Sequence, residues 1–473
     1  MSDNSSEPTN LKKRVFVKTF GCQMNEYDTE KMLALISDSY QRVDTAEEAD
    51  LAIVNTCSVR EKGEHKLFGL LGRLRDIKKN NPDYVIGVGG CVAQQEGQNI
   101  ITRNSAVDFV VGTHNLSYVP ALIKSSIETR TKQVAIDYRD EWEELPDQFN
   151  AMPSDQNIVS STFNTNVRAL VAIQRGCNKK CAFCVVPTTR GPQVSRLEEE
   201  ILKEVRLKTR MGAREVMLLG QTVNSYGVDL VDRKKFSNLI RRIAEIENVE
   251  RIRFTSPHPA EIKKDFIDLY KEVPQLCPHV HMPLQSGSNR ILKAMNRNYR
   301  RERFLEVVND IKMARPDVAI STDIIVGFPT ETQSDFEDTL EIMNLLKFHS
   351  SFSYKYSIRP NTKANLNYLD SDEVEESVKT ERLMKIQALQ QEHSLEFNTR
   401  FLGQKVAILG ESNLSELNVV KGRTEHNIFA EIVIDETIDK NGVGKLIEGR
   451  VARATPHGIK MISESAYQNS ILN

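Results

Sequence analysis

The feature that most constrains this fold is a repeated alternation of short apolar runs with segments of helix-like apolar spacing. In the first part of the chain, helical spacing covers residues 28–38 and 61–79, and apolar runs flank both. Strand, helix and strand in repetition indicate a parallel sheet covered by helices. We therefore expect residues 14–128 to form an open, flavodoxin-like or Rossmann-like α/β domain, with strands at 15–20, 51–55, 85–89 and 107–111.

The same alternation resumes after residue 167 and continues to about residue 361. Six strand–helix units predict a partial (β/α)6 barrel over residues 167–400, and in such barrels the chemistry lies at the C-terminal ends of the strands. The expected strands are 169–174, 215–220, 251–256, 280–284, 319–326 and 352–357, with helices such as 197–209, 236–246 and 336–346 between them.

The remaining segments carry other patterns. A long polar helix is expected at 371–401, and short strands separated by glycines then predict a small antiparallel β-barrel over 401–465. Residues 129–166 hold the only Trp and several polar runs, which is typical of a linker, and we expect tails at 1–13 and 466–473. The expected barrel strands are 405–409, 419–421, 428–433, 446–452 and 459–462.

Charge and hydropathy exclude several classes of protein. Lys and Arg total 63 against 65 for Asp and Glu, a net charge of -2, so any nucleic-acid contact must come from local basic patches. No run approaches the roughly 20 apolar residues of a membrane helix, and the polar N-terminus lacks the core of a secretory signal. We expect a cytoplasmic protein, in which seven cysteines favour metal binding over disulfides.

The sharpest chemical signal is a C-x₃-C-x₂-C motif formed by Cys177, Cys181 and Cys184. It follows the first expected barrel strand, so the three thiolates are expected at the C-terminal mouth of the barrel. Three thiolates can hold three corners of a [4Fe–4S] cluster and leave the fourth iron open, as catalytic metal centres require. The alternatives are three incidental thiols or a zinc site, but no His or Cys follows within about 70 residues to complete a zinc site.

Three further cysteines share a second pattern. Cys22, Cys57 and Cys91 each lie just past the C-terminal end of an expected parallel strand. Because those ends share one edge of the sheet, we expect the three to meet and to hold a second [4Fe–4S] cluster. The alternative is three buried thiols, which is our expectation for Cys277, a member of neither set. The neighbouring glycines expected to let the backbone approach a bulky ligand are Gly21, Gly89 and Gly90.

The two triads and their surroundings resemble the methylthiotransferase family of radical S-adenosylmethionine enzymes. The resemblance runs from about residue 14 to residue 463. It is carried by Lys18-Thr-Phe-Gly-Cys22-Gln-Met-Asn25-Glu-Tyr-Asp28, Asn55-Thr-Cys57-Ser-Val-Arg60-Glu-Lys62, Gly87-Val-Gly-Gly-Cys91-Val-Ala, Cys184-Val-Val-Pro187-Thr-Thr-Arg190-Gly191, Ser195-Arg196, Leu219-Gly220-Gln221-Thr-Val-Asn224-Ser-Tyr226-Gly227 and His281-Met-Pro283-Leu-Gln285-Ser286-Gly287-Ser288.

The resemblance implies a reaction. One S-adenosylmethionine would chelate the open iron at Cys177, Cys181 and Cys184 and yield a deoxyadenosyl radical, while another methylates a sulfur held at the other triad. The stretch from Cys22 and the Arg60-Glu-Lys sequence indicate members that act on a prenylated adenosine. Carbon 2 of N6-dimethylallyladenosine at position 37 of tRNA would gain the methylthio group. The implied partners are a tRNA anticodon stem–loop, a low-potential electron donor and a sulfur donor, and we expect a monomer.

Polar residues at the expected strand ends are candidates for S-adenosylmethionine or adenosine contacts, although each could instead cap a loop. Arg190 and Arg196 could pair with a carboxylate or phosphate, or be surface charges, whereas His65, His114 and His279 have no expected role. The strand-end candidates are Gln221, Asn224, Ser256, His258, Gln285, Ser286 and Asp323.

The resemblance also implies that the C-terminal barrel binds RNA, and Gly422-Arg-Thr-Glu-His-Asn427 is similar to that domain's signature. RNA readers splay loop bases and base-modifying enzymes flip them, so an adenosine must be presented outward. Residues 403–464 hold 8 basic and 9 acidic side chains, so the domain is not basic overall. The candidate phosphate contacts, each of which could be a plain surface charge, are Lys421, Arg423, Arg450, Arg453 and Lys460.

Two stretches depart from the family pattern, since Thr330 and Asn361 stand where glycine is expected and Lys363 where proline is expected. Three other functions compete with the one above. Two are sister reactions, on threonylcarbamoyladenosine in tRNA or on an aspartate of a ribosomal protein. The third is a non-catalytic iron–sulfur protein that binds RNA or senses redox state, which the open-iron motif on a barrel disfavours.

Overall fold

The computed structural model describes residues 12–58, 61–147, 167–368, 373–414, 418–433 and 442–472. The chain divides into two compact units. The first contains the described residues up to 147 together with Thr188–Gly191, and the second contains the rest. The expected N-terminal tail, up to residue 11, and the 148–166 part of the expected linker lie outside the described residues.

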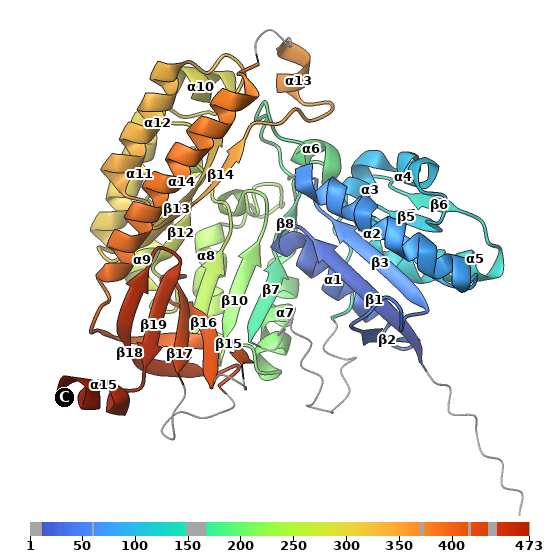
Figure 1. The fold of residues 1–473 in the computed structure, drawn as a ribbon, viewed down its shortest axis with the longest axis horizontal. Coiled ribbons are helices and arrows are strands. Elements are labelled where there is room, and N and C mark those ends of the chain that lie inside the picture. Colours follow the sequence, from blue (N-terminus) through green and yellow to red (C-terminus); the bar gives the residue numbers. More distant parts are fainter. Residues whose placement is uncertain are drawn as a thin grey trace, which may run out of the picture. The chain divides into compact units, whose positions relative to one another are not determined.

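The first unit is built on one six-stranded sheet in which all neighbouring strands are parallel (Figure 1). The strand order is β2-β1-β3-β4-β5-β6, so the chain reverses its direction of winding beside β1. This confirms the predicted parallel α/β sheet. The strands are β1 (Lys13–Phe20), β2 (Tyr40–Val43), β3 (Leu51–Thr56), β4 (Val85–Gly90), β5 (Phe109–Val111) and β6 (Gln133–Ala135).

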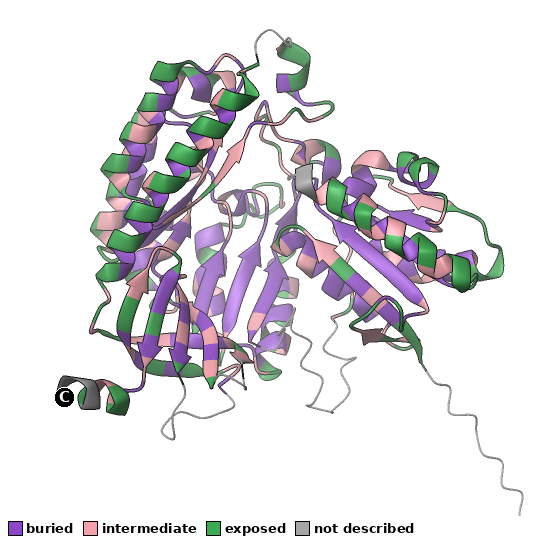
Figure 2. Ribbon diagram, in the orientation of Figure 1, coloured by how far each residue is buried: buried purple, intermediate pink, exposed green. Residues whose placement is uncertain are grey.

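Helices cover both faces of this sheet because its central strands are apolar on both sides. Leu51 and Ile53 of β3 pack with helices α1 and α5, whereas Ala52 and Val54 face α2, α3 and α4. Strands β3 and β4 are buried along their whole length (Figure 2). The helices are α1 (Gln23–Ile36), α2 (Glu61–Asn80), α3 (Cys91–Glu96), α4 (Gln98–Arg103) and α5 (Val119–Glu128), with a 3₁₀ turn η1 (Leu116–Tyr118).

Two strands of this sheet were not predicted. Strand β2 has four half-exposed or exposed residues, and β6 has three half-exposed residues within the expected linker. Both lie at the edges of the sheet, where a strand buries little apolar surface. Edge strands this short carry too few residues for a period-two pattern to stand out.

The second unit contains the six predicted barrel strands, paired in parallel as β11-β10-β7 and β12-β13-β14. A parallel bridge between Ile252 of β11 and Leu276, shortly before β12, connects the two three-stranded sheets. The strands are β7 (Arg168–Ala172), β10 (Glu215–Leu219), β11 (Arg251–Phe254), β12 (His279–His281), β13 (Ala319–Val326) and β14 (Ser350–Lys355), and a small pair, β8 (Gln174–Arg175) with β9 (Val194–Ser195), follows β7.

Helices surround the outside of this barrel, and their outer faces are exposed (Figure 2). Long helix α14 packs on β14 and reaches the C-terminal domain, where Asn398 Nδ2 donates to the Thr455 carbonyl over 2.8 Å. The helices are α6 (Val186–Thr189), α7 (Glu198–Arg210), α8 (Phe236–Ala244), α9 (Lys264–Glu272), α10 (Asn289–Ala294), α11 (Arg301–Ala314), α12 (Gln333–Leu346), α13 (Lys363–Asn367) and α14 (Glu376–Thr399), with 3₁₀ turns η3 (Val223–Ser225) and η4 (Pro259–Glu261).

The C-terminal residues form the predicted closed barrel, in the order β15-β16-β17-β19-β18. One pair, β17 with β19, is parallel rather than antiparallel, because β18 lies between them in sequence. Helix α15 (Glu464–Leu472) occupies the expected C-terminal tail. The barrel strands are β15 (Lys405–Leu414), β16 (Val419–Thr424), β17 (Phe429–Val433), β18 (Leu446–Thr455) and β19 (Gly458–Ile462).

The small barrel packs against the N-terminal ends of the (β/α) strands. Arg251, the first residue of β11, donates to the carbonyls of Ala407 and Arg423 over 3.1 and 2.9 Å. Arg253 donates to the carbonyls of Thr424 and Glu425 over 2.7 and 2.9 Å. The strands' opposite, C-terminal ends therefore stay clear of the small barrel. No helix among the described residues is both long and apolar enough to cross a membrane.

Candidate active site

The first triad lies at one edge of the six-stranded sheet. Cys22 precedes α1 directly after β1, Cys57 follows β3, and Cys91 begins α3 directly after β4. Strands β1, β3 and β4 are consecutive neighbours in the sheet, so their C-terminal ends bring the three cysteines together as predicted. The site lies where the order of strands reverses, the usual ligand position of such sheets.

The three thiols influence one another's protonation. Hydrogen bonding to Cys57, aided by the nearby Arg190 charge and opposed by burial, lowers the pKa of Cys22 to about 7 and that of Cys91 to about 6. The same hydrogen bonds, and then burial, raise the pKa of Cys57 well above its usual value. Thiolate is the form that binds metal, so two of these three side chains are prepared to be ligands near neutral pH.

A pair of buried amides supports this triad. Asn25 Nδ2 donates to Asn55 Oδ1 over 3.1 Å, and Asn55 Nδ2 donates to the Asn25 carbonyl over 2.8 Å. The Cys22 thiol donates to Asn25 Oδ1 over 3.3 Å. Both asparagines are fully buried, so they fix the helix that follows Cys22 against the strand that leads to Cys57. The sequence motifs contained both residues, but their contact depends on which strands are neighbours.

Glycines beside the triad serve the packing of the protein itself. Gly21 and Gly90 have φ angles of +155° and +92°, and a Cβ on Gly90 would lie 2.2 Å from Asn55 Oδ1. A Cβ on Gly21 would lie 2.6 Å from the Cys57 Cβ atom. Gly89 differs, because its Cβ would lie 3.4 Å from Val111, an ordinary contact. Two of the three glycines are thus required where they stand.

We expect Gly90→Ala to destabilise the first unit by about 2–4 kcal/mol, since it combines a steric clash with an unfavourable φ. The displaced Asn55 and Thr56 lead directly to Cys57, so iron bound after anaerobic reconstitution should also fall. Differential scanning calorimetry and iron analysis measure both effects. The matched control is Gly89→Ala, which should change stability by less than about 1 kcal/mol. Equal effects of the two substitutions would contradict this account.

The second triad lies on the loop that follows β7 and β8. The backbone N–H of Lys179 donates to Cys177 Sγ over 3.4 Å, and the N–H of Val186 donates to Cys184 Sγ over 3.5 Å. Burial, followed by the charge of Cys181, raises the pKa of Cys184 to about 12. Three thiols on one short loop, two of them accepting backbone hydrogen bonds, are a donor set that fits an iron–sulfur cluster.

The spacing of the thiols argues against zinc. A tetrahedral zinc ion with bonds of about 2.3 Å holds its sulfur ligands roughly 4 Å apart. Within the described part of the chain, the one group of three potential ligand atoms lying within 4.8 Å of one another involves no cysteine. Neither triad is therefore gathered as tightly as a single ion requires.

Arg297 is a residue of this site that the sequence did not single out. Its Nη1 donates to Cys181 Sγ over 3.3 Å, and its Nη2 donates to the Pro283 carbonyl over 3.3 Å. The Tyr299 hydroxyl donates to the same carbonyl over 3.0 Å and contacts the guanidinium. Hydrogen bonds to a ligand sulfur tune the potential of an iron–sulfur cluster. Only the fold shows that this arginine, 113 residues after Cys184 in the sequence, reaches the triad.

The strand-end candidates divide into two groups. Asn224 caps a loop, because its amide exchanges hydrogen bonds of 3.0 and 2.8 Å with the backbone of His258. Ser286 is fully buried and accepts from the Ser288 N–H over 3.2 Å. Burial lowers the pKa of His258 to about 3, so its ring is neutral and accepts from the Ala260 N–H. These three have structural partners.

The other strand-end candidates keep features that suit a ligand. Ser256 and Gln285 hold φ angles of +48° and +71°, a strained conformation that concentrates at functional sites. Gln221 Oε1 is buried, with no hydrogen-bond partner among the described residues. The Asp323 carboxylate lies 3.1 Å from His281 Nε2 and is partly exposed. We keep these four as candidate S-adenosylmethionine or substrate contacts.

The two arginines expected to pair with a carboxylate or phosphate have different environments. Arg190 Nη2 donates to Asp28 Oδ2 over 2.6 Å inside the first unit. Arg196 pairs with Glu204 over 2.5 Å and donates to the Ala172 carbonyl, and both of its partners are in the second unit. Cys277 is buried, as expected for a structural thiol, and burial raises its pKa to about 11.

Most candidate RNA contacts on the small barrel are already paired. Lys421 and Lys460 lie 3.3 and 3.7 Å from Glu431, and Arg423 lies 3.5 Å from Glu411. Arg450 donates to both oxygens of Glu464 over 2.9 Å. Arg453 is exposed, and no ion-pair partner is found for it among the described residues. Charge alone therefore does not single out one face of the small barrel as the expected RNA contact.

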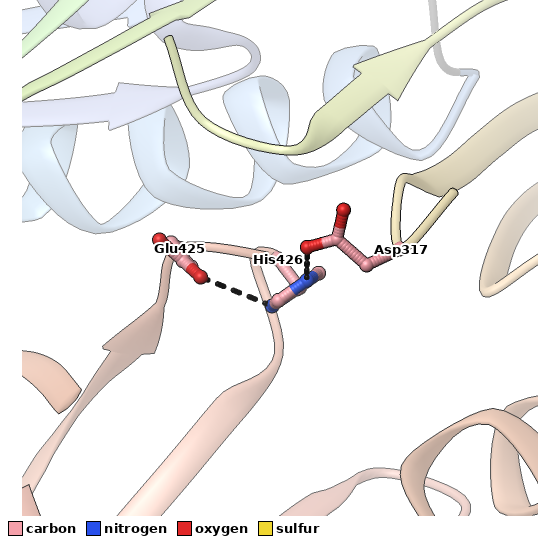
Figure 3. Close-up of side chains that lie close together, drawn as sticks. All are labelled: Asp317, Glu425 and His426. Carbon is pink, nitrogen blue, oxygen red and sulfur yellow. Dashed lines mark hydrogen bonds and ion pairs between the residues drawn. The ribbon is translucent and has the colours of Figure 1, made fainter. Parts of the chain in front are cut away.

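Residues 422–427, which resemble the signature of an RNA-binding barrel, make contacts with other parts of the chain. The His426 ring lies with Nε2 3.2 Å from Asp317 Oδ2 and Nδ1 4.0 Å from Glu425 Oε1 (Figure 3). The carboxylates of Asp317 and Glu425 lie beside different nitrogens of the His426 ring, whereas the ligands of a metal ion must all point toward the ion. Together with the carbonyls that accept from Arg251 and Arg253, this arrangement makes the segment an anchor for the small barrel.

The two departures from the family pattern keep the backbone shape that glycine would give. Thr330 and Asn361 have φ angles of +68° and +58°, within the left-handed region that glycine adopts readily. Asn tolerates this region, whereas a β-branched Thr does so at a cost. Arg290 holds the Thr330 turn by donating to its side chain over 3.2 Å and to its carbonyl over 2.5 Å.

Comparison with known proteins gives matches along nearly the whole chain. Residues 171–343 match the model of the radical SAM superfamily, and residues 14–112 match the model described as "Uncharacterized protein family UPF0004". A tRNA-2-methylthio-N(6)-dimethylallyladenosine synthase of Thermobifida fusca is 41% identical over 96% of this chain and 89% of its own. Proteins of the same name from Burkholderia thailandensis and Geobacter metallireducens are each 39% identical, over 95% and 94% of this chain and 97% of theirs.

Solved structures with a similar fold are also radical enzymes. The radical S-adenosylmethionine methyltransferase TsrM of Kitasatospora setae, with cobalamin and a [4Fe-4S] cluster bound, aligns at a TM-score of 0.53 over 75% of this chain and 74% of its own, with 13% identity. The apo form of the cobalamin-dependent S-adenosylmethionine radical enzyme OxsB aligns at 0.51 over 76% and 55%, with 12% identity. At these identities the likeness shows the fold alone.

Proposed function

The chain belongs to the family of tRNA-2-methylthio-N(6)-dimethylallyladenosine synthases within the radical SAM superfamily, and from this we propose that it attaches a methylthio group to carbon 2 of N6-dimethylallyladenosine at position 37 of tRNA. The observation that carries the proposal is the extent of the similarity. Identities of 39–41% extend over 94–96% of the chain, so both cysteine triads and the small barrel fall within one relationship.

Within this reaction, Cys177, Cys181 and Cys184 would hold the radical-generating [4Fe–4S] cluster at the C-terminal mouth of the barrel. The N–H groups of Lys179 and Val186 then stabilise the ligand sulfurs of this cluster. Gln221, Ser256, Gln285 and Asp323 would orient S-adenosylmethionine or the adenine. The first three follow the C-terminal ends of β10, β11 and β12, and Asp323 lies within β13. When bound, the cluster and S-adenosylmethionine supply the radical that removes the hydrogen from carbon 2.

Cys22, Cys57 and Cys91 would hold a second [4Fe–4S] cluster that carries the sulfur to be inserted. The convergence of the three thiols and the low pKa values of Cys22 and Cys91 support this role. A sulfur donor must renew the inserted atom and a low-potential electron donor must supply electrons. Because the substrate is tRNA, we place the reaction in the cytoplasm and expect a monomer to carry it out, with an anticodon stem–loop contacting the small barrel.

Nucleoside mass spectrometry of tRNA tests the substrate assignment. In a strain that lacks this protein, 2-methylthio-N6-dimethylallyladenosine should disappear and N6-dimethylallyladenosine should accumulate. The methylthio derivative of threonylcarbamoyladenosine and the ribosomal proteins should be unchanged. A plasmid that carries the intact chain should restore the nucleoside, whereas a Cys177→Ala chain should not. Persistence of the nucleoside in the deletion strain would refute the proposal.

A further inference from the structure

A buried cation lies beside the triad of Cys22, Cys57 and Cys91. The Arg190 side chain is only 5% exposed, and its Nη2 donates over 2.6 Å to Asp28, whose side chain is 7% exposed. The Arg190 side chain also hydrogen-bonds to the side chain of Cys91, and Asp28 lies in α1, the helix that begins directly after Cys22. A guanidinium does not lose its proton in proteins, so this position carries a permanent positive charge.

The backbone around Arg190 is held independently of its ion pair. The carbonyl of Arg190 lies 3.0 Å from His114 Nε2, and the carbonyl of Thr189 accepts from the Thr113 hydroxyl over 2.7 Å. The Tyr138 hydroxyl donates to the carbonyl of Thr188. Thr113, His114 and Tyr138 thus bind three successive carbonyls of the segment 188–191, and this fixes where the guanidinium of Arg190 can lie.

Stability alone is a weak reason for such an arrangement. A buried ion pair is expensive to desolvate and often adds nothing over apolar residues of similar volume. A fixed charge beside three sulfur ligands has a direct chemical effect, because the net charge around an iron–sulfur cluster sets its reduction potential. Reduction adds one electron to the cluster, so a nearby cation favours the reduced state and a nearby anion disfavours it.

We propose that Arg190 is a positioning residue that acts as the fixed counter-charge of the cluster at Cys22, Cys57 and Cys91, and that Asp28 opposes it, so that this ion pair sets the cluster's reduction potential. The inference rests on the proposed function, which places a cluster at this triad. It makes a prediction that a structural ion pair does not make: removing one or the other partner should move the potential in opposite directions.

The test uses the full-length chain with Cys177, Cys181 and Cys184 changed to Ala, reconstituted anaerobically with iron and sulfide. Dithionite titration followed by electron paramagnetic resonance gives the one-electron potential of the remaining cluster. Arg190→Gln should disfavour reduction by about tenfold, a fall of about 59 mV. Asp28→Asn should favour reduction by a similar factor, and Arg190→Lys, which keeps the charge, should stay within about threefold of the parent.

The double variant Arg190→Gln with Asp28→Asn should lie between the two single variants, because both charges are gone. The matched control is the exposed ion pair of Arg130 with Asp83. Asp83 lies before the N-terminal end of β4, whereas Cys91 follows its C-terminal end. Arg130→Gln makes the same change of net charge and should leave the potential within about twofold of the parent.

Each outcome decides between the readings. Shifts of the same sign in both single variants, or no shift with iron retained, would overturn the counter-charge. If Arg190→Gln holds no cluster, Arg190→Lys decides, because a charge-preserving variant that also fails or shifts tenfold shows that only the shape of arginine matters. An iron-free parent chain would instead show that the proposed second cluster is wrong.

Discussion

Changing Cys22, Cys57 and Cys91 together to Ala is expected to abolish methylthio transfer while S-adenosylmethionine cleavage continues. The reason is the separation of roles between the two triads. Cys177, Cys181 and Cys184 remain to hold the radical-generating cluster, but nothing holds the sulfur to be inserted. Bound iron should fall from about eight to about four per chain, methylthio nucleoside should fall to background, and deoxyadenosine should still form. Iron analysis and chromatography of anaerobic reactions with tRNA measure all three quantities.

The reciprocal variant and a cysteine control complete this experiment. Changing Cys177, Cys181 and Cys184 to Ala should also leave about four irons, but it should remove deoxyadenosine and product together. Cys277→Ala is the matched control, since this buried thiol belongs to neither triad and should leave about eight irons. An unchanged iron content in the first variant would show that the second cluster does not exist.

The positions of the six cysteines were largely predictable from the sequence. Strand periodicity marks where β1, β3 and β4 end, and parallel strands that are neighbours end at one edge of a sheet. The same reasoning predicts that Cys22, Cys57 and Cys91 meet, and the order β1-β3-β4 in the sheet agrees with it. It failed for the short edge strands β2 and β6, which bury too little apolar surface to leave a pattern.

The residues around the triads were harder to predict because their roles depend on partners far away in the sequence. Arg190 meets Asp28 across 162 residues, and Arg297 meets Cys181 across 116. The partners of the charged residues on the small barrel were not predictable for the same reason. Arg450, a predicted phosphate contact, lies 2.8 Å from Glu464, a pairing that the sequence pattern does not show. Pattern and spacing reveal the ligands of a site, whereas the charges that act on them require the tertiary structure.

A buried network of ion pairs joins the small barrel to the (β/α) barrel. We expect its loss to lower the free energy of unfolding of the second unit. Glu215 is fully buried at the start of β10, and it accepts from Arg168 Nε over 2.6 Å and from Arg253 Nε over 2.8 Å. Arg253 also donates to the carbonyls of Thr424 and Glu425 in the small barrel. The carboxylate of Glu215 therefore holds in place the arginine that anchors the segment 422–427.

We expect Glu215→Gln to lower the free energy of unfolding of the second unit by about 3–5 kcal/mol at pH 7, because it leaves buried guanidinium groups without their anion. Amide hydrogen exchange in strands β16 and β17 should accelerate as the small barrel loosens. Calorimetry and hydrogen–deuterium exchange mass spectrometry give the two readouts. Glu411→Gln is the matched control, because Glu411 also pairs with Arg168 but is 30% exposed, and should cost less than about 1 kcal/mol.

The pH dependence gives an independent check on the same carboxylate. Although burial opposes ionisation, Arg253 and then Arg168 hold the pKa of Glu215 at about 2, below its usual value of 4.5. A depressed pKa stabilises the folded state above pH 4.5, and that contribution of about 3 kcal/mol is lost as the pH falls toward 2. The stability difference between the parent and Glu215→Gln, measured on cluster-free protein, should therefore narrow over this window. A difference that stays constant down to pH 2 would mean that Glu215 is not the ionised centre of this network.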